Sequence, residues 1–159
     1  MELESFKKHI QILSEPEANK YRTLYINKYI DTRSKCYTER VEKQYLFSDG
    51  LCYTGYLWDF LKTPSIIQES HLDNYRRFLR DILVFWDNHS KDRIRINNYW
   101  KFGKKSMINL DYNLFLDNMK FFPEDIYLTD RELAWTIVFT HEEDIENNRI
   151  IMQVGLNNL

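Results

Sequence analysis

The chain has 159 residues and a formal net charge of -2, and 43% of its residues are hydrophobic and 29% charged. These are ordinary values for a folded globular protein, and the length suits a single domain over residues 1–159. Because dedicated nucleic-acid and anionic-membrane binders concentrate positive charge, the slight negative charge argues against both classes. No stretch approaches the roughly 20 apolar residues that a membrane span needs, so we expect no membrane association.

Cysteine usage and the amino terminus both predict a cytoplasmic protein. Two cysteines, Cys36 and Cys52, are too few for a disulfide framework and have no metal-ligand spacing, so we expect two free thiols. The amino-terminal stretch mixes charged and apolar residues and lacks the apolar core of a secretory signal. Abundant Asn, Ile, Lys and Tyr are typical of bacterial proteins from low-GC genomes.

The first 30 residues predict two helices. Apolar residues at steps of three and four between Leu3 and Leu13 form the stripe of an amphipathic helix. Ser14 can cap a second helix that runs to about Ile30, and Pro16 suits its first turn. We expect the two helices to pack antiparallel.

The middle of the chain predicts short strands and helices in alternation. Ser48-Asp49-Gly50 is a turn signal, Ser70 is a good N-cap, and the apolar run from Ile82 to Trp86 indicates a buried strand. Periodicity alone leaves a longer helix as the alternative for that run. The predicted elements are a strand over 41–47, a helix over 53–61, a helix over 72–82, a strand over 82–86 and a helix over 107–119.

The carboxyl-terminal third predicts a meander of three strands. Residues 125–128 and 133–140 are rich in β-forming residues and are joined by the turn 129–132, which indicates a hairpin. Residues 149–154 supply a third strand. We therefore predict an α+β fold, with N-terminal helices packed on a small, mainly antiparallel sheet formed largely by the C-terminal third.

The stretch WTIVFTHEED, Trp135 to Asp144, carries the first group of candidate functional residues. Alternation along a strand would place Trp135 and His141 on the same apolar face and turn Glu142 outward. A histidine beside carboxylates can bind a metal, but the second histidine used by zincins one helical turn later is missing. We favour a hydrogen-bonded histidine at a strand end, with metal ligation as the alternative.

The loop WDNHSKDR, Trp86 to Arg93, carries the second group. Asp87 and His89 follow a predicted buried strand, where functional side chains are often displayed. If this loop meets His141 and Glu142 in space, the four side chains could hold a divalent ion. The alternative, which we favour, is a polar turn that bonds its own backbone, so we expect no metal and no cofactor.

The segment NNYWKFGKK, Asn97 to Lys105, could bind single-stranded RNA. Aromatic side chains there could stack on bases while lysines neutralise phosphates. We favour the alternative, in which the aromatic residues lie in the core and the lysines in water, because the net charge is negative. The candidate binding residues are Tyr99, Trp100, Lys101 and Lys104.

The segment DIYLTDRELAWTIVFTHEED, Asp125 to Asp144, resembles the closing hairpin of several small uncharacterised bacterial families, some of them associated with toxin-immunity loci. The resemblance covers these residues only. It implies a cytoplasmic protein that binds another protein and has no catalysis of its own.

Three functions of different classes follow from these patterns. The first is a small protein-binding or immunity/inhibitor-like protein, which we favour because no complete catalytic set is visible. The second is a metal-dependent hydrolase, and the third is an RNA-binding module built on the Asn97–Lys105 segment. The hydrolase would use Asp87, His89, His141 and Glu142.

Overall fold

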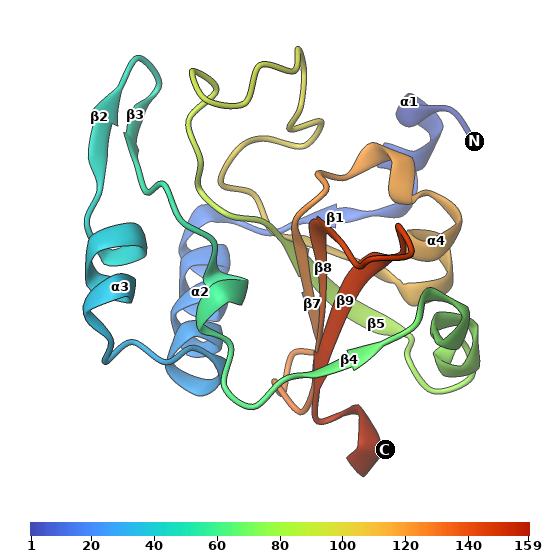
Figure 1. The fold of residues 1–159 in the computed structure, drawn as a ribbon. Helices are drawn as coiled ribbons and strands as arrows, with labels where there is room; N and C mark the ends of the chain where they lie inside the picture. Colours follow the sequence, from blue (N-terminus) through green and yellow to red (C-terminus); the bar gives the residue numbers. More distant parts are fainter.

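A seven-stranded antiparallel sheet runs through the centre of the computed structural model, which describes residues 1–159 (Figure 1). Its strand order is β1-β6-β5-β7-β8-β9-β4, and a separate two-stranded hairpin, β2-β3, stands beside it. The strands are β1 (Gln11–Ile12), β2 (Tyr45–Phe47), β3 (Gly50–Cys52), β4 (Ser65–Ile67), β5 (Asp81–Phe85), β6 (Ile108–Asp111), β7 (Ile126–Thr129), β8 (Thr136–Glu143) and β9 (Arg149–Val154). The predicted α+β fold is confirmed, and the strands β6 to β9 all come from the last third of the chain.

Helices cover both faces of this sheet (Figure 1). The α-helices are α1 (Leu3–Phe6), α2 (Glu15–Tyr29), α3 (Lys35–Tyr37) and α4 (Tyr112–Asp117), and a π-helical turn spans Thr38–Glu42. Short 3-10 helices lie at Lys7–His9, Leu57–Phe60, Glu69–Tyr75, Met119–Phe121 and Leu156–Asn158. α2 and α3 lie on one side and α1 and α4 on the other. None of these helices is both long enough and apolar enough to cross a membrane.

The central strand β5 explains why its sequence is a continuous apolar run. Leu83 and Phe85 pack into the cluster on the α2 side, whereas Ile82, Val84 and Trp86 pack into the cluster on the α1 and α4 side. A strand that is buried on both faces needs apolar side chains at every position. The prediction of a strand rather than a longer helix over this run is confirmed.

The first two helices are only partly as predicted. The second one is confirmed, since α2 begins after Ser14, whose hydroxyl accepts a hydrogen bond from the Glu17 amide. The first helix stops early, and Gln11–Ile12 instead pairs with β6 at the edge of the sheet. The predicted antiparallel packing of the two helices is wrong, because Phe6 and Tyr25 belong to core clusters on opposite faces of the sheet.

Three further helix predictions fail where tertiary contacts override local periodicity. Residues 53–61 form only the 3-10 helix Leu57–Phe60, and residues 72–82 begin in a 3-10 helix and end in β5. Residues 107–119 split into β6, which pairs with β5, and α4, which Asp111 caps through hydrogen bonds to two backbone amides. The strand predicted over 41–47 begins only at Tyr45.

The buried indole of Trp135 gives a test of this core. Its side chain is 2% exposed and packs with Ile137 and Phe139. Trp135→Ala removes most of that contact area, so we expect a loss of roughly 3–5 kcal/mol in the free energy of unfolding. Urea titration followed by circular dichroism measures this loss. Ile145→Ala, in the fully exposed turn between β8 and β9, is the control and should unfold like the wild type. Equal midpoints for the two variants would contradict the assigned core.

Candidate functional site

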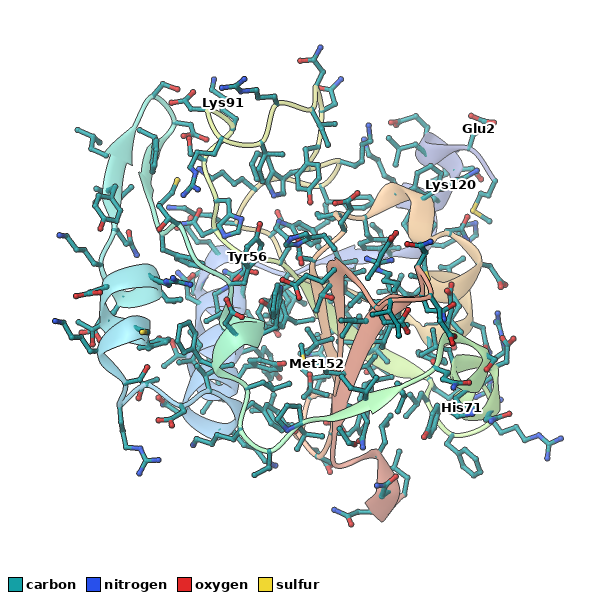
Figure 2. All side chains as sticks on the ribbon, in the orientation of Figure 1. Glu2, Tyr56, His71, Lys91, Lys120 and Met152 are labelled. Carbon is teal, nitrogen blue, oxygen red and sulfur yellow. The ribbon has the colours of Figure 1, made fainter.

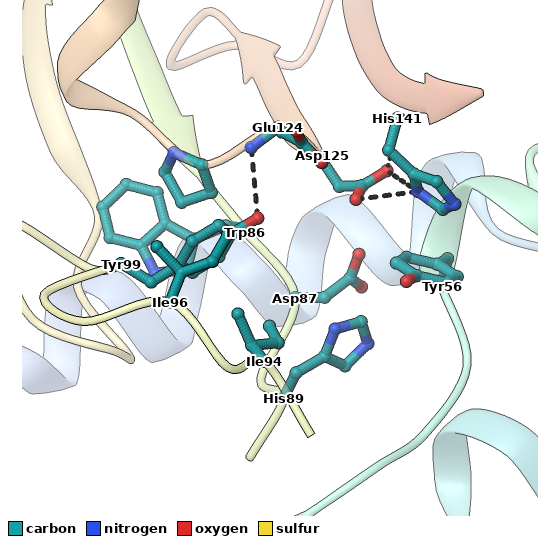
Figure 3. A pocket seen from close by; sticks show the side chains of 11 residues that line it. Tyr56, Trp86, Asp87, His89, Ile94, Ile96, Tyr99, Glu124, Asp125 and His141 are labelled. Atoms are coloured by element: carbon teal, nitrogen blue, oxygen red, sulfur yellow. Dashed lines mark hydrogen bonds and ion pairs between the residues drawn. The ribbon is translucent and has the colours of Figure 1, made fainter. Parts of the chain in front are cut away.

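A cavity of about 160 Å³ opens at one end of the central strands of the sheet (Figure 3). Antiparallel pairing brings the carboxyl end of β5, the amino end of β7 and the carboxyl end of β8 to the same end of the sheet. The side chains that follow or precede these strand ends therefore converge. They include Asp87 and His89 after β5, Asp125 before β7 and His141 near the end of β8.

The Asp87 carboxylate forms the floor of the site. It is buried and accepts hydrogen bonds from the hydroxyls of Tyr53 and Tyr127, each at 2.7 Å, and from the backbone amide of Leu57 at 3.1 Å. Burial raises the pKa of this carboxyl, while the charge of His89 and the three hydrogen bonds act in the opposite direction. Two of the three donors, Tyr53 and Leu57, belong to the 53–57 segment. Asp87 therefore holds this segment against the end of the sheet.

His89 is the inner of the two histidines. Its imidazole is buried, and Nε2 lies 2.5 Å from the carbonyl oxygen of Gly55. Since a carbonyl only accepts, Nε2 carries the proton and donates it. The ring also meets the ring of Tyr56 edge-on, with 4.8 Å between the centroids. This histidine therefore fixes the backbone at Gly55, the residue next to Tyr56.

His141 is the outer histidine, and it pairs with Asp125. Nδ1 of His141 lies 3.0 Å from both carboxylate oxygens of Asp125, which also accepts hydrogen bonds from the His141 amide and from Nε1 of Trp58. Because Asp125 occupies Nδ1, Nε2 is left free, and it points away from the carboxylate in Figure 3. The side chain is 36% exposed. The predicted hydrogen-bonded histidine at a strand end matches this contact.

The face of the strand on which His141 lies was predicted wrongly. Simple alternation from Phe139 would direct it toward the α1 and α4 side of the sheet, but its ring lies beside Tyr56 and Trp58, on the other side. The pairing of β8 with β9 shifts register between Phe139 and Glu143. A bulge of this kind breaks the period-two alternation and redirects the following side chains.

A second hollow of about 340 Å³ adjoins the cavity and shares Tyr56 and His141 with it. Four charged side chains line it, and none of them takes part in an ion pair within the chain. Burial and the neighbouring Glu142 raise the pKa of Asp59. The four side chains are Arg40, Asp59, Arg93 and Glu142.

The hairpin β2-β3 is fastened to the loop that follows β5. At the hairpin turn, Asp49 accepts hydrogen bonds from Ser90 Oγ at 2.7 Å, from the Lys91 amide at 2.8 Å and from Lys104 Nζ at 2.9 Å. Asp92 in turn accepts two hydrogen bonds from Ser48. Figure 2 shows Lys91 at the outer end of this loop. We call these contacts the hairpin clamp.

The predicted site residues are thus only partly brought together. Asp87, His89 and His141 share the cavity, whereas Glu142 is exposed and lines the adjoining hollow. Within the predicted RNA segment, Lys101 is exposed, but the Lys104 side chain is only 17% exposed and its ammonium is paired with Asp49. The other two members are half-buried: the Tyr99 hydroxyl accepts a hydrogen bond from the Glu124 amide, and Trp100 packs at the edge of the core.

Sequence reasoning missed Tyr56, Asp125 and Arg93. Asp125 had a detectable signal, because it is the first residue of a predicted strand whose hairpin partner was predicted to end at Thr140, next to His141. Tyr56 had none, since its place depends on the bonds from Tyr53 and Leu57 to Asp87, which lies 30 or more positions away.

Comparison of the chain with protein-family models, with curated proteins and with solved structures found no match.

The hairpin clamp gives a pH-dependent test. Burial alone would raise the pKa of the Asp49 carboxyl, but hydrogen bonds from Ser90, Lys104 and Lys91 hold it well below its usual range. A lowered pKa contributes stability above the unfolded value of about 3.9, and that stability is lost as the pH falls through the folded value. Asp49→Asn should therefore lower the melting midpoint at pH 7, and the difference from wild type should shrink below about pH 4.

Thermal melting of both proteins at pH 7 and at about pH 3 measures this difference. Glu4→Gln is the control, because Glu4 forms an exposed ion pair with Lys7. Its substitution should change the melting midpoint little at either pH. A difference between Asp49→Asn and wild type that stays constant across the two pH values would contradict the clamp.

Proposed function

We propose that this chain is a small cytoplasmic bacterial protein that binds another protein, in the manner of an immunity or inhibitor protein. The single observation that supports the proposal is the ring of charged side chains around Tyr56 that have no ion-pair partner within the chain. Tyrosine and arginine are the residues most enriched where binding energy concentrates in interfaces. Arg40 and Arg93 beside Tyr56 fit that composition.

The hairpin offers an exposed apolar patch of its own. Leu46 and Leu51 lie directly opposite each other in the β2-β3 pair, so their side chains project from the same face of the hairpin. They are 81% and 53% exposed. Because the hairpin clamp already holds this element, binding there would require little further ordering of the backbone.

The partner-binding proposal is tested by cross-linking followed by affinity measurement. A benzophenone amino acid in place of Thr54, which lines the same hollow, should capture one cellular protein in stoichiometric amount. With that protein purified, Tyr56→Ala and Arg93→Ala should each raise the Kd at least about tenfold, or about 1.4 kcal/mol, by titration calorimetry.

Phe78→Ala is the matched control for these titrations. Phe78 is also aromatic and exposed, but it lies before β5, at the opposite end of that strand from the cavity. It should leave the Kd unchanged. If Phe78→Ala weakens binding as much as Tyr56→Ala, the partner does not bind at the cavity.

The second candidate is an acid–base hydrolase, and the pairing of His141 with Asp125 favours it. A histidine oriented through Nδ1 by a carboxylate, with Nε2 open to the cavity, is the arrangement of a general base. In this proposal His141 would activate water, Asp125 would orient the imidazole, and Arg93 would attract an anionic ester.

The metal-dependent form of this hydrolase has less support. It requires Asp87 as a ligand, yet both oxygens of that carboxylate already accept hydrogen bonds from buried tyrosines. No group of three or more His, Cys, Asp or Glu side chains is placed to hold a metal ion. The RNA-binding proposal also has less support, because Asp49 already neutralises Lys104.

The hydrolase candidate is tested with bis(4-nitrophenyl) phosphate as substrate. If the wild type hydrolyses it, His141→Gln should lower kcat by about 10²–10⁴ because the general base is lost. Glu142→Gln, in the adjoining hollow, is the control and should retain the wild-type rate. Equal rates in the wild type and His141→Gln would refute the base assignment. Loss of activity with a chelator and recovery with added zinc would favour the metal-dependent form.

A further inference from the structure

Cys52 and Lys104 are in direct contact although 52 positions separate them in the sequence. Nζ of Lys104 lies 2.7 Å from Sγ of Cys52 and donates a hydrogen bond to the sulfur. Cys52 is the last residue of β3, and Lys104 belongs to the long loop between β5 and β6. The pair therefore joins the hairpin to the loop at the hairpin clamp.

Both side chains of the pair are held in place by other contacts. The Lys104 ammonium also donates to Asp49 at 2.9 Å, and its carbonyl oxygen accepts a hydrogen bond from Nε1 of Trp86 at 2.7 Å. Cys52 is buried and pairs with Tyr45 across the hairpin. No rotation or loop movement is needed to bring the nitrogen and the sulfur together.

Only the Lys104 side of this pair borders an open hollow. Lys104 and Asp49 line an open hollow of about 610 Å³ between the hairpin turn and the loop. Cys52 is 0% exposed and does not line the hollow, so a peroxide reaches the sulfur only when the Lys104 side chain moves aside. Burial alone would lower the pKa of Lys104, but hydrogen bonds to Cys52 and Asp49 raise it.

We propose that Cys52 and Lys104 form a covalent sulfenamide cross-link when the protein meets hydrogen peroxide. The Cys52 thiolate attacks peroxide, the O–O bond breaks, and the sulfur is oxidised by two electrons to a sulfenic acid with release of hydroxide. Lys104 gives up one proton to the hydroxide, and its neutral amine then attacks the sulfur. The S–N bond forms, the S–O bond breaks, and water leaves. Overall, thiolate, ammonium and peroxide give the sulfenamide and two waters.

The cross-link would lock the hairpin to the loop independently of any partner. A sulfenic acid is otherwise free to oxidise further to irreversible acids, and capture by a nearby nitrogen prevents this. Thiols reverse the S–N bond, so the lock would open again in a reducing compartment. Cys36 is exposed and would be oxidised separately, so the test replaces it with serine.

Intact-mass spectrometry of the full-length Cys36→Ser variant tests the proposal. Mild hydrogen peroxide should lower the mass by about 2 Da, the loss of two hydrogens, and dithiothreitol should restore it. Tryptic digestion should give one joined peptide that contains both Cys52 and an uncleaved Lys104. The oxidised protein should also melt at a higher temperature than the reduced one.

Two further variants separate the cross-link from other oxidations. Cys36→Ser with Cys52→Ser should show no mass loss, and Cys36→Ser with Lys104→Arg should keep the charge near Asp49 but form no joined peptide. Addition of one to three oxygens at Cys52 without a joined peptide overturns the proposal. An unchanged mass also overturns it. So does a joined peptide about 14 Da heavier than the sum of the two reduced peptides, because that peptide would contain a bridging oxygen. The joined peptide of the Cys36→Ser protein decides the matter even if the Lys104→Arg variant fails to fold.

Discussion

The carboxylate of Asp87 is the group on which the rest of the site depends. A buried carboxylate without partners would be strongly unfavourable, and here two tyrosine hydroxyls and one amide stabilise it. The guanidinium of Arg22 lies near the same group. Burial lowers the pKa of Arg22, and the charges of Tyr53 and Asp87 act in the opposite direction. The interior of this end of the sheet is thus a set of mutually dependent polar groups, in which Nη2 of Arg22 is buried without a hydrogen-bond partner.

From Asp87 a chain of hydrogen bonds leads outward to the cavity. Tyr127 donates to Asp87 and accepts from the amide of Trp58, whose indole donates to Asp125. Asp125 then orients His141. The position of the exposed imidazole therefore depends on a buried carboxylate through three intermediate residues. Networks of this kind are favourable only when every member is satisfied, so a change at Asp87 should disturb the site as a whole.

These long-range contacts explain how much of the molecule could be predicted from its sequence. The apolar runs of β5, β7, β8 and β9 identify strands, because burial of these segments leaves a pattern within a few residues. The segment 53–61 has apolar residues at helical spacing, yet Asp87 holds it as a bend followed by a short 3-10 helix. No local pattern contains that partner. Asp87, His89 and His141 could be named as candidates because each lies at a strand end. Their convergence required the strand order, and the side of the sheet on which His141 lies required a bulge that alternation cannot reveal.

The two histidines show how a structural side chain differs from an available one. The ring of His89 is buried, and its Nε2 donates a hydrogen bond to the Gly55 carbonyl. These structural contacts explain why a histidine is present at position 89. Asp125 also has a structural reason to be present, since it accepts hydrogen bonds from the Trp58 indole and from the backbone amide of His141. Both of those contacts would survive without an imidazole at position 141. The contacts of Asp125 with Trp58 and the backbone therefore do not account for the His141 ring, which packs against Tyr56 and Trp58. Its half-open position between Tyr56 and the charged hollow is where a partner or a substrate would gain the most by contact.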